Sequence, residues 1–140
     1  MIPIKRVVFA WLIADGDMHL KNMAVLKIAE PGDPAFRSVR LAPVYDTLTT
    51  RVFPRLEHDR MALKLNGRDE RLMRADFLAV SAMAGLRASD TNAAIDDVLN
   101  RMRSAVAAIT LPTLPGYGPS GEAAVTRALA ICRERIAGFA

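Results

Sequence analysis

Three side chains with oxygen atoms, Asp17, Asn22 and Asp46, are spaced so that they could meet at one ligand. Asp17 and Asn22 lie five positions apart in a polar loop, IADGDMHLKN at 13–22. Asp46 follows a predicted β-hairpin, which returns the chain to its starting point and so brings Asp46 back beside Asn22. Mg²⁺ takes oxygen ligands from protein, phosphate and water, and a separate carboxylate can orient an attacking hydroxyl. The set is therefore typical of Mg²⁺-assisted phosphoryl transfer.

The spacing D-x-x-x-x-N, followed later by a second Asp, is also that of a protein-kinase catalytic loop and its magnesium-binding Asp. The pattern departs from the usual one in two places. Asp15 and Gly16 precede Asp17 where kinases have His-Arg, and the second Asp lies in PVYDTL in place of D-F-G. D-x-x-x-x-N is weak by itself and gains weight from the order helix, loop, hairpin, second Asp.

The elements that must position these residues can be read from hydrophobic patterning. The segment 3–14 is apolar nearly all round and predicts a buried, central helix. The alternating segments 22–30 and 36–44, joined by the turn PGDP, predict the hairpin. An irregular loop is expected over 45–60, and after it a short apolar stretch, MALKL, that ends at the turn Asn-Gly.

Three further helices are expected after residue 75. The first begins near Asp76 and ends at Gly85, and the second is expected to be capped by Ser89 or Asp90. The apolar face of the second helix comprises Ile95, Val98, Leu99, Met102, Val106 and Ile109. The last is expected over about 122–137, with Val125, Leu129, Cys132 and Ile136 on one face. The predicted fold class is α+β, mostly α.

The segment 111–121 is rich in Pro and Gly and is interpreted as a linker. Its letters GYGPSG match a glycine-rich phosphate loop, but no predicted strand precedes them, as such a loop requires. Two arginines, Arg51 and Arg55, flank the loop after Asp46. They could contact phosphate or a protein substrate, or lie on a solvated surface, and the sequence favours neither.

Composition sets the remaining bounds. The 140 residues are 51% hydrophobic and 24% charged, enough for one domain with a core. A net charge of +4 without a basic block is compatible with phosphate-bearing ligands but does not indicate a nucleic-acid interface, and it favours a solvated surface. The single cysteine, Cys132, excludes an intrachain disulfide and favours a reducing cytoplasm. The apolar run at 7–14 is far shorter than the roughly 20 residues of a membrane span, so no membrane association is expected.

Four blocks, in this order, resemble the C-terminal lobe of HipA-like kinases: WLIADGDMHLKNMAVL, LAPVYDTLTT, MALKLNG and RADFLAVSAMAGL. These kinases are the Ser/Thr kinase toxins of HipA–HipB toxin–antitoxin modules. The family pattern G-D-x-H-x-K-N matches Gly16, Asp17, His19, Lys21 and Asn22, and its Y-D matches Tyr45 and Asp46. The resemblance spans roughly residues 5–110.

The resemblance implies roles for these residues. Asp17 would be the catalytic base, and Lys21 would approach the transferred phosphate. Asn22 and Asp46 would hold Mg²⁺ against the phosphates of ATP at the small hairpin of a kinase-like C-lobe. His19 and Tyr45 would support the loop. Asp15 has no counterpart role and is expected only to cap the turn.

The resemblance also implies a missing part. A kinase needs a Lys at the α/β-phosphates, its Glu partner and a loop over the phosphates, which belong to an N-terminal lobe. We therefore expect a C-lobe core at 1–110, the linker at 111–121 and a C-terminal helix at 122–140 that packs on the same domain. With the N-lobe absent, the chain is expected to be inactive in isolation.

The expected partners are a HipB-like antitoxin and a protein substrate with Ser or Thr, with DNA reached only through the antitoxin. Two alternatives stay open. The chain could be a non-catalytic helical module that binds an antitoxin or a separate N-lobe. It could also be a small-molecule phosphotransferase of the aminoglycoside or choline kinase type, since DGDMHLKN matches their motif H-G-D-x-H-x-x-N except at Asp15.

Overall fold

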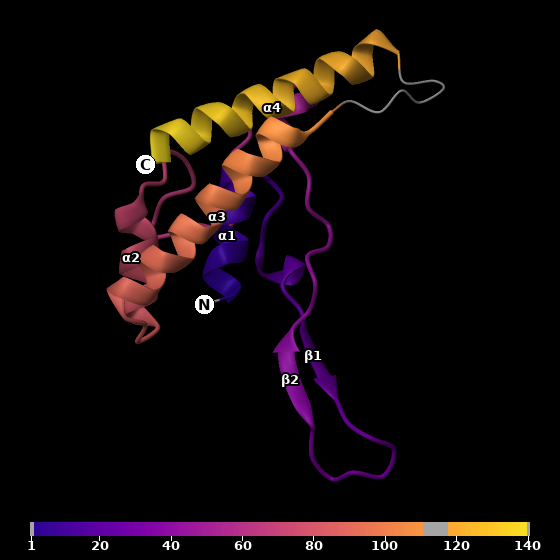
Figure 1. Ribbon diagram of the computed structural model, residues 1–140, viewed down its shortest axis with the longest axis vertical. Helices are drawn as coiled ribbons and strands as arrows, with labels where there is room; N and C mark the ends of the chain where they lie inside the picture. Colours follow the sequence, from indigo (N-terminus) through magenta and orange to yellow (C-terminus); the bar gives the residue numbers. More distant parts are fainter. Residues whose placement is uncertain (1, 111–117, 140) are drawn as a thin grey trace.

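The computed structural model describes residues 2–110 and 118–139. It contains four helices and one two-stranded antiparallel sheet, consistent with the predicted α+β class (Figure 1). The helices are α1 (Ile2–Leu12), α2 (Arg74–Met83), α3 (Ala88–Ala108) and α4 (Pro119–Phe139), and the strands are β1 (Val25–Ile28) and β2 (Ser38–Leu41). Two single 3₁₀ turns, η1 (Leu20–Asn22) and η2 (Thr50–Val52), lie in the loops.

Helix α1 is central, as its apolar composition predicts. It packs against α3 and α4, and α2 packs against α3 (Figure 1). Most side chains of α1 are buried, including those of Val8 and Leu12, which have no exposed surface. At the far end of the core, Phe77 of α2 meets Phe139 of α4 edge to face, with ring centroids 5.3 Å apart. The helices thus form one core around α1.

The predicted apolar face of α3 is confirmed over most of its length. Its buried apolar side chains are Ala94, Ile95, Val98, Leu99, Met102 and Val106. Ile109 lies just past the helix and is half exposed. The predicted cap is wrong, because the helix starts at Ala88 and Arg87 occupies the cap position without a side-chain cap. Asp90 accepts hydrogen bonds from the Arg87 guanidinium instead, at 2.8 and 3.2 Å.

The hairpin is confirmed and projects from the helical body (Figure 1). Val25 pairs with Leu41 at its root, and Ile28 pairs with Ser38 near its tip. Every residue of β1 is exposed, including the apolar ones. A two-stranded hairpin without a covered face is marginally stable alone, so its root must be held by the body.

The C-terminal helix starts three positions before the predicted Glu122. Cys132, Ile136 and Phe139 of α4 are buried in the core, whereas Val125 and Leu129 are half-buried. Most of the predicted linker, 111–117, lies outside the described residues. The last three residues of GYGPSG, 119–121, form the first turn of α4. Gly118 is the one described residue before that helix.

Candidate active site

Helix α1 ends in a tight turn at residues 13–15, which sets the direction in which the polar loop leaves the helix. The amide of Asp15 donates to the carbonyl of Ala10 at 2.9 Å, and the amide of Ala14 donates to that of Trp11 at 3.1 Å. These are the two hydrogen bonds of a Schellman motif. The left-handed residue of this motif is usually glycine, but here it is Ala14, with φ of 57°. Local strain of roughly 1–2 kcal/mol is therefore held at the entry to the loop.

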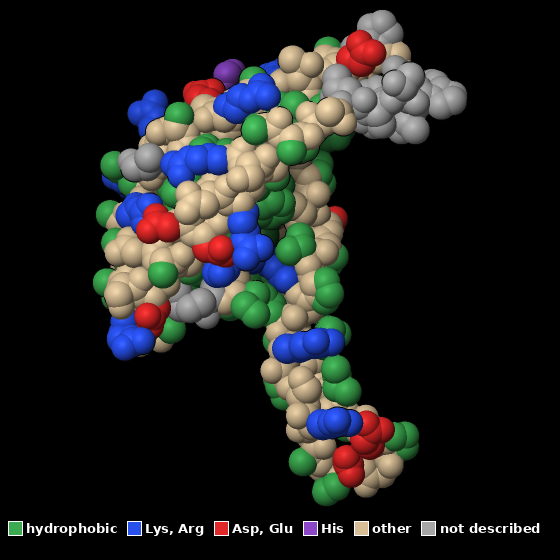
Figure 2. Space-filling model, viewed as in Figure 1, with side chains coloured by type: hydrophobic (Ala, Val, Ile, Leu, Met, Phe, Trp, Pro, Cys, Tyr) green, Lys and Arg blue, Asp and Glu red, His purple; other side chains and the backbone are tan. Residues whose placement is uncertain are grey.

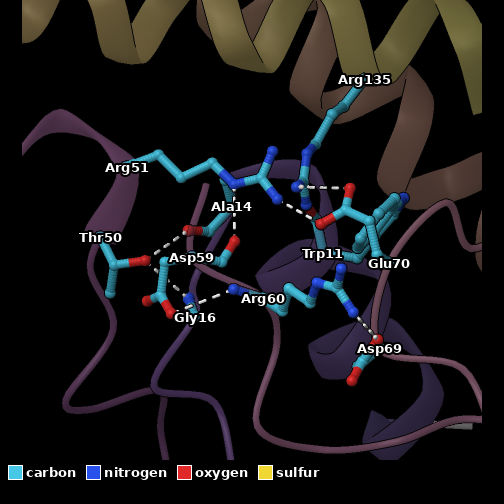
Figure 3. A network of polar contacts seen from close by, with 10 residues as sticks. All are labelled: Trp11, Ala14, Gly16, Thr50, Arg51, Asp59, Arg60, Asp69, Glu70 and Arg135. Carbon is cyan, nitrogen blue, oxygen red and sulfur yellow. Dashed lines mark hydrogen bonds and ion pairs between the residues drawn. The ribbon is translucent and has the colours of Figure 1, made fainter. Parts of the chain in front are cut away.

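The loop that carries Asp17 is fixed from two sides. Its backbone pairs with a later segment, since the amides of Ala62 and Leu63 donate to the carbonyls of Gly16 and Met18, both at 2.8 Å. On the other side, the amide of Gly16 donates to Thr50 Oγ1 at 3.0 Å (Figure 3). Met18 is buried beneath, whereas Asp17 is exposed. The catalytic-base candidate thus presents its carboxylate to solvent from a rigid backbone.

Gly16 is required by close packing. A Cβ atom at this position would lie 1.9 Å from Asp59 Oδ2 and 2.6 Å from Thr50 Oγ1. Figure 3 shows both side chains directed at the Gly16 backbone. The glycine therefore admits the segment 50–59 close against the loop, and this segment is the part of the chain that follows Asp46.

Asn22 and Asp46 meet at the root of the hairpin. Asn22 Nδ2 donates to Asp46 Oδ2 at 3.0 Å and to the Asp46 carbonyl at 3.3 Å. The ladder ends beside them, where the amide of Ala42 donates to the carbonyl of Ala24 at 2.8 Å. Asp46 has a left-handed backbone, with φ of 51°. Asn22 is buried and Asp46 is exposed, so the pair lies at the surface of the body.

The remaining predicted residues surround this pair. The backbone amide of His19 donates to Asn22 Oδ1 at 2.9 Å, and the His19 ring also contacts that oxygen. Tyr45 Oη donates to the carbonyl of Lys21 at 2.7 Å, which ties the two sides of the hairpin root together. Lys21 is exposed on η1 and pairs with no acidic side chain of the described residues. His19 and Tyr45 thus contact the loop that they were expected to support.

Asp15 does not cap the turn, contrary to the prediction from the sequence, because its carboxyl group makes no hydrogen bond among the described residues. Its side chain is only 1% exposed, and both carboxyl oxygens lack a hydrogen-bond partner among the described residues. Burial, together with the charges of Asp17 and Asp46, raises its pKa to about 6. The backbone amides of Asp17 and Leu48 face the carboxyl and oppose this rise, although neither makes a hydrogen bond of normal geometry. Three carboxyl groups therefore gather at this site.

A comparison with protein families shows to which family the chain belongs. The family model described as "HipA-like C-terminal domain" matches residues 3–106. The chain belongs to this family. In this HipA-like domain, the match begins in α1 and ends in α3, so it includes the polar loop and the hairpin but not α4.

Among curated proteins, the HipA-like domain is similar to one named "Putative kinase Y4dM" from Sinorhizobium fredii. The two are 45% identical over 47 residues, which is 34% of this chain and 10% of the relative. The similarity thus spans about a tenth of the relative's length. No solved structure matches the chain at a significant level. Across the described ranges, no helix is both long and apolar enough to cross a membrane.

The donor set at the hairpin root suits Mg²⁺ better than a softer metal. Within residues 2–110 and 118–139, no three His, Cys, Asp or Glu side chains are placed to hold a metal ion. Mg²⁺ needs only one or two protein oxygens, with phosphate and water supplying the others. Asp46 offers an exposed carboxylate, and Asn22 would add its oxygen once the amide turned, since Nδ2 now faces Asp46. The unpaired Asp15 carboxyl adds negative potential nearby.

Helix α4, outside the family match, is joined to the segment after Asp46 by two arginines. Arg51 donates to the carbonyl of Asp59 at 2.8 Å and pairs with Glu70 (Figure 3). Arg135 of α4 reaches the same carboxylate at 3.7 Å, and its guanidinium lies 3.8 Å from the centre of the Trp11 ring. Burial and the nearby charge of Arg51 lower the pKa of Arg135 to about 10.

This network shows how one of the two loop arginines, Arg51, is engaged. Arg51 is half-buried and occupied by Glu70, so it is neither a solvated side chain nor open to phosphate. Arg55 is exposed, with a left-handed φ of 72°. The sequence carried no local signal for Arg135, because its partners lie far away along the chain.

Proposed function

We propose that this HipA-like domain is the catalytic lobe of a Ser/Thr protein kinase that transfers the γ-phosphoryl group of Mg²⁺-ATP to a protein hydroxyl. The observation that carries the proposal is the contact between Asn22 and Asp46 at the hairpin root, beside the fixed loop of Asp17. Family membership and the similarity to a protein named as a kinase support it.

Each residue has a distinct part in the proposed reaction. Asp17, exposed on a rigid loop, orients the substrate hydroxyl and accepts its proton. Asn22 and Asp46 would hold the metal through their oxygens, and Lys21 would provide a positive charge next to the transferred group. Mg²⁺, when bound, neutralises charge on the phosphate oxygens. His19 and Tyr45 fix the backbone on either side of the metal ligands.

A complete kinase site needs further groups. In other protein kinases a glycine-rich loop covers the phosphates, and a Lys with a Glu partner contacts them. In the described residues, β1 and β2 are the only strands, and they form the projecting hairpin. We therefore propose that a second lobe supplies these groups, and we expect the 140-residue chain alone to show little or no kinase activity.

The biological setting is proposed by analogy with the family. The acceptor would be Ser or Thr of a protein, and the partner would be a HipB-like antitoxin that brings the kinase to DNA. Such a toxin would act in the cytoplasm, where ATP and its acceptor are found.

A metal titration tests the site in the chain itself. Adding MnCl₂, as a paramagnetic substitute for Mg²⁺, to the ¹⁵N-labelled chain should broaden the NMR signals of Asn22 and Asp46 first. Asp46→Asn should abolish this local broadening. Asp33→Asn, at the exposed turn of the hairpin, is the matched control and should leave it unchanged. Uniform, weak broadening in all three proteins would contradict a metal site at the hairpin root.

A chimaera tests turnover. Residues 3–106, which match the family model, would replace the HipA-like C-terminal domain of a full-length kinase of the family, and transfer of ³²P from labelled ATP to protein would be measured. Asp17→Asn should reduce turnover about 10²- to 10⁴-fold while ATP binding persists. Asp46→Asn should weaken Mg²⁺-ATP binding itself. If the unmodified chimaera binds Mn²⁺ but transfers no phosphate, the non-catalytic module is the better description.

A further inference from the structure

A groove separate from the candidate active site runs between α1 and α3. Its volume is about 470 Å³. Its apolar walls are formed by Ile2, Phe9, Val44, Val98, Met102 and Ala105. The groove is open to solvent, and two of its lining residues, Ile2 and Val44, are 60% and 51% exposed. Exposed apolar surface of this kind marks binding sites more often than chance exposure does.

A buried arginine with unused donors lines this groove. Arg6 is only 7% exposed, and its Nη2 donates to the carbonyl of Ala42 at the end of the hairpin. Its Nε and Nη1 are buried and have no hydrogen-bond partner among the described residues. A guanidinium that is buried without an anion is costly, because its charge and its donors have left water. The groove therefore offers a charged site that the described residues leave unfilled.

The other charged residues of the groove do not supply that anion. Asp97 is the acidic residue in the lining, and it is shared by two cations. Lys5 contacts Asp97 at 2.7 Å, and Arg101 contacts it at 2.9 Å. The lining thus holds three positive charges and one negative charge. Figure 2 shows basic side chains gathered around an acidic one where the helical body meets the hairpin.

We propose that the groove binds a segment of a partner protein in which one Asp or Glu side chain, flanked by apolar residues, pairs with Arg6. Charge complementarity favours the carboxylate, since the lining is net positive and Arg6 has no acidic partner among the described residues. The apolar walls and the volume of about 470 Å³ favour a ligand with apolar surface on either side of its carboxylate over a free anion. The proposal is independent of phosphoryl transfer and would hold for a non-catalytic domain as well.

Peptide selection tests the proposal on the 140-residue chain. A phage library of random 12-residue peptides would be panned against the immobilised chain, and the affinities of enriched peptides would be measured by fluorescence anisotropy. We expect enrichment of peptides with one Asp or Glu among apolar residues. Changing that Glu to Gln in the peptide, or Arg6→Met in the chain, should weaken binding ~30-fold or more, as expected when one partner of a buried charge pair is lost.

A pair of substitutions on α3, Ala105→Trp and Ala107→Trp, separates loss of the groove from loss of the fold. Arg6→Met also removes the hydrogen bond to Ala42, so its helicity is checked by circular dichroism. Ala105→Trp fills the groove from an exposed position on α3 and should weaken binding to a similar degree. Ala107→Trp, also exposed on α3 but outside the groove, is the matched control and should bind normally.

Several results would overturn the proposal. They are the absence of enriched peptides, enrichment of peptides without an acidic residue, and peptide binding that neither Arg6→Met nor Ala105→Trp weakens. Octanoate serves as a probe for a small carboxylate ligand. If octanoate shifts the Arg6 Nε–H signal in an NMR titration while no peptide binds, the groove is a small-molecule site and the protein partner is wrong.

Discussion

Asn22 and Asp46 are joined by a hydrogen bond of 3.0 Å although 24 positions separate them in the chain. The hairpin between them makes this possible, because its two strands return the chain to the point where it left the body. The contact lies next to the loop of Asp17, which is held by backbone hydrogen bonds to 62–63. Two loops that arise from different parts of the sequence therefore form one acidic site.

Asp15 should make the stability of the domain fall as pH rises. Its pKa is 3.8 in an ordinary environment and about 6 in the fold, so the folded state holds the proton more tightly. Folding therefore binds protons between pH 4 and 6, and stability is lost as pH rises through this window. Ionising Asp15 in the folded state lowers the free energy of unfolding by about 2–3 kcal/mol, and this loss is complete above pH 6.

Asp15→Asn tests this sign. The variant should be about 1–2 kcal/mol more stable than the native chain at pH 7.5, because no charge is buried, and the two should be similar at pH 4. Urea unfolding followed by circular dichroism at both pH values measures the difference. Asp33→Asn, on an exposed residue, controls for net charge. An equal gain at both pH values would show that the charge of Asp15 is not responsible.

Gly16→Ala should destabilise the domain. The added Cβ would lie 1.9 Å from Asp59 Oδ2 and 2.6 Å from Thr50 Oγ1, so the Asp59 carboxylate must turn away and the buried, hydrogen-bonded Thr50 must shift. We expect a loss of roughly 1–3 kcal/mol in unfolding free energy, as for overpacked sites. Thermal unfolding measures it. Gly138→Ala, at an open position on α4, should be neutral or slightly stabilising, and an equal loss there would refute the packing argument.

Arg135→Met should loosen α4. The change removes the contact with the Trp11 ring and the hydrogen bond to its carbonyl, and it leaves Glu70 paired only with Arg51. We expect a loss of about 2 kcal/mol or more, since breaking a largely buried charge network costs at least this much. Trp11 is the single tryptophan, so its fluorescence reports the site directly.

A neighbour on the same helix provides the control. Arg133→Met removes the same charge from an exposed position and should change neither stability nor the emission maximum of Trp11 by a measurable amount. Equal effects of the two substitutions would mean that overall charge, and not the Trp11 contact, explains the loss.

Cys132 should react slowly in the folded protein. The thiol is buried on α4, and burial raises its pKa, so little thiolate is present at neutral pH. Iodoacetamide should alkylate the native chain much more slowly than the chain in 6 M guanidinium chloride, as measured by intact mass. Because this is the only cysteine, each chain can gain one adduct. Similar rates in both conditions would show that α4 opens readily.

Local sequence patterns determined much of this fold. The apolar segment 3–14 predicted α1, alternation and a Pro-Gly turn predicted the hairpin, and three- and four-residue spacing predicted the buried face of α3. The hairpin prediction alone was enough to place Asp46 beside Asn22. These features follow from interactions between near neighbours or from one short return of the chain, which sequence spacing describes well.

The environments of charged side chains were decided by the tertiary structure. Asp15 was expected to cap a turn and is buried without a partner, and Ser89 or Asp90 was expected to cap α3, where Arg87 takes Asp90 as its own partner. Arg6 lies in an apolar helix whose sequence gives no sign of its contact with Ala42.

Arg135 shows the physical reason most clearly. It meets Trp11 across 124 positions, and only the packing of α4 on α1 brings the two together. Hydrophobic periodicity fixes which face of a helix is buried, but burial and charge pairing depend on which distant segment covers that face. The sequence by itself thus determined the elements and the acidic loop, and the tertiary structure decided which charges lost their water and which of them found partners.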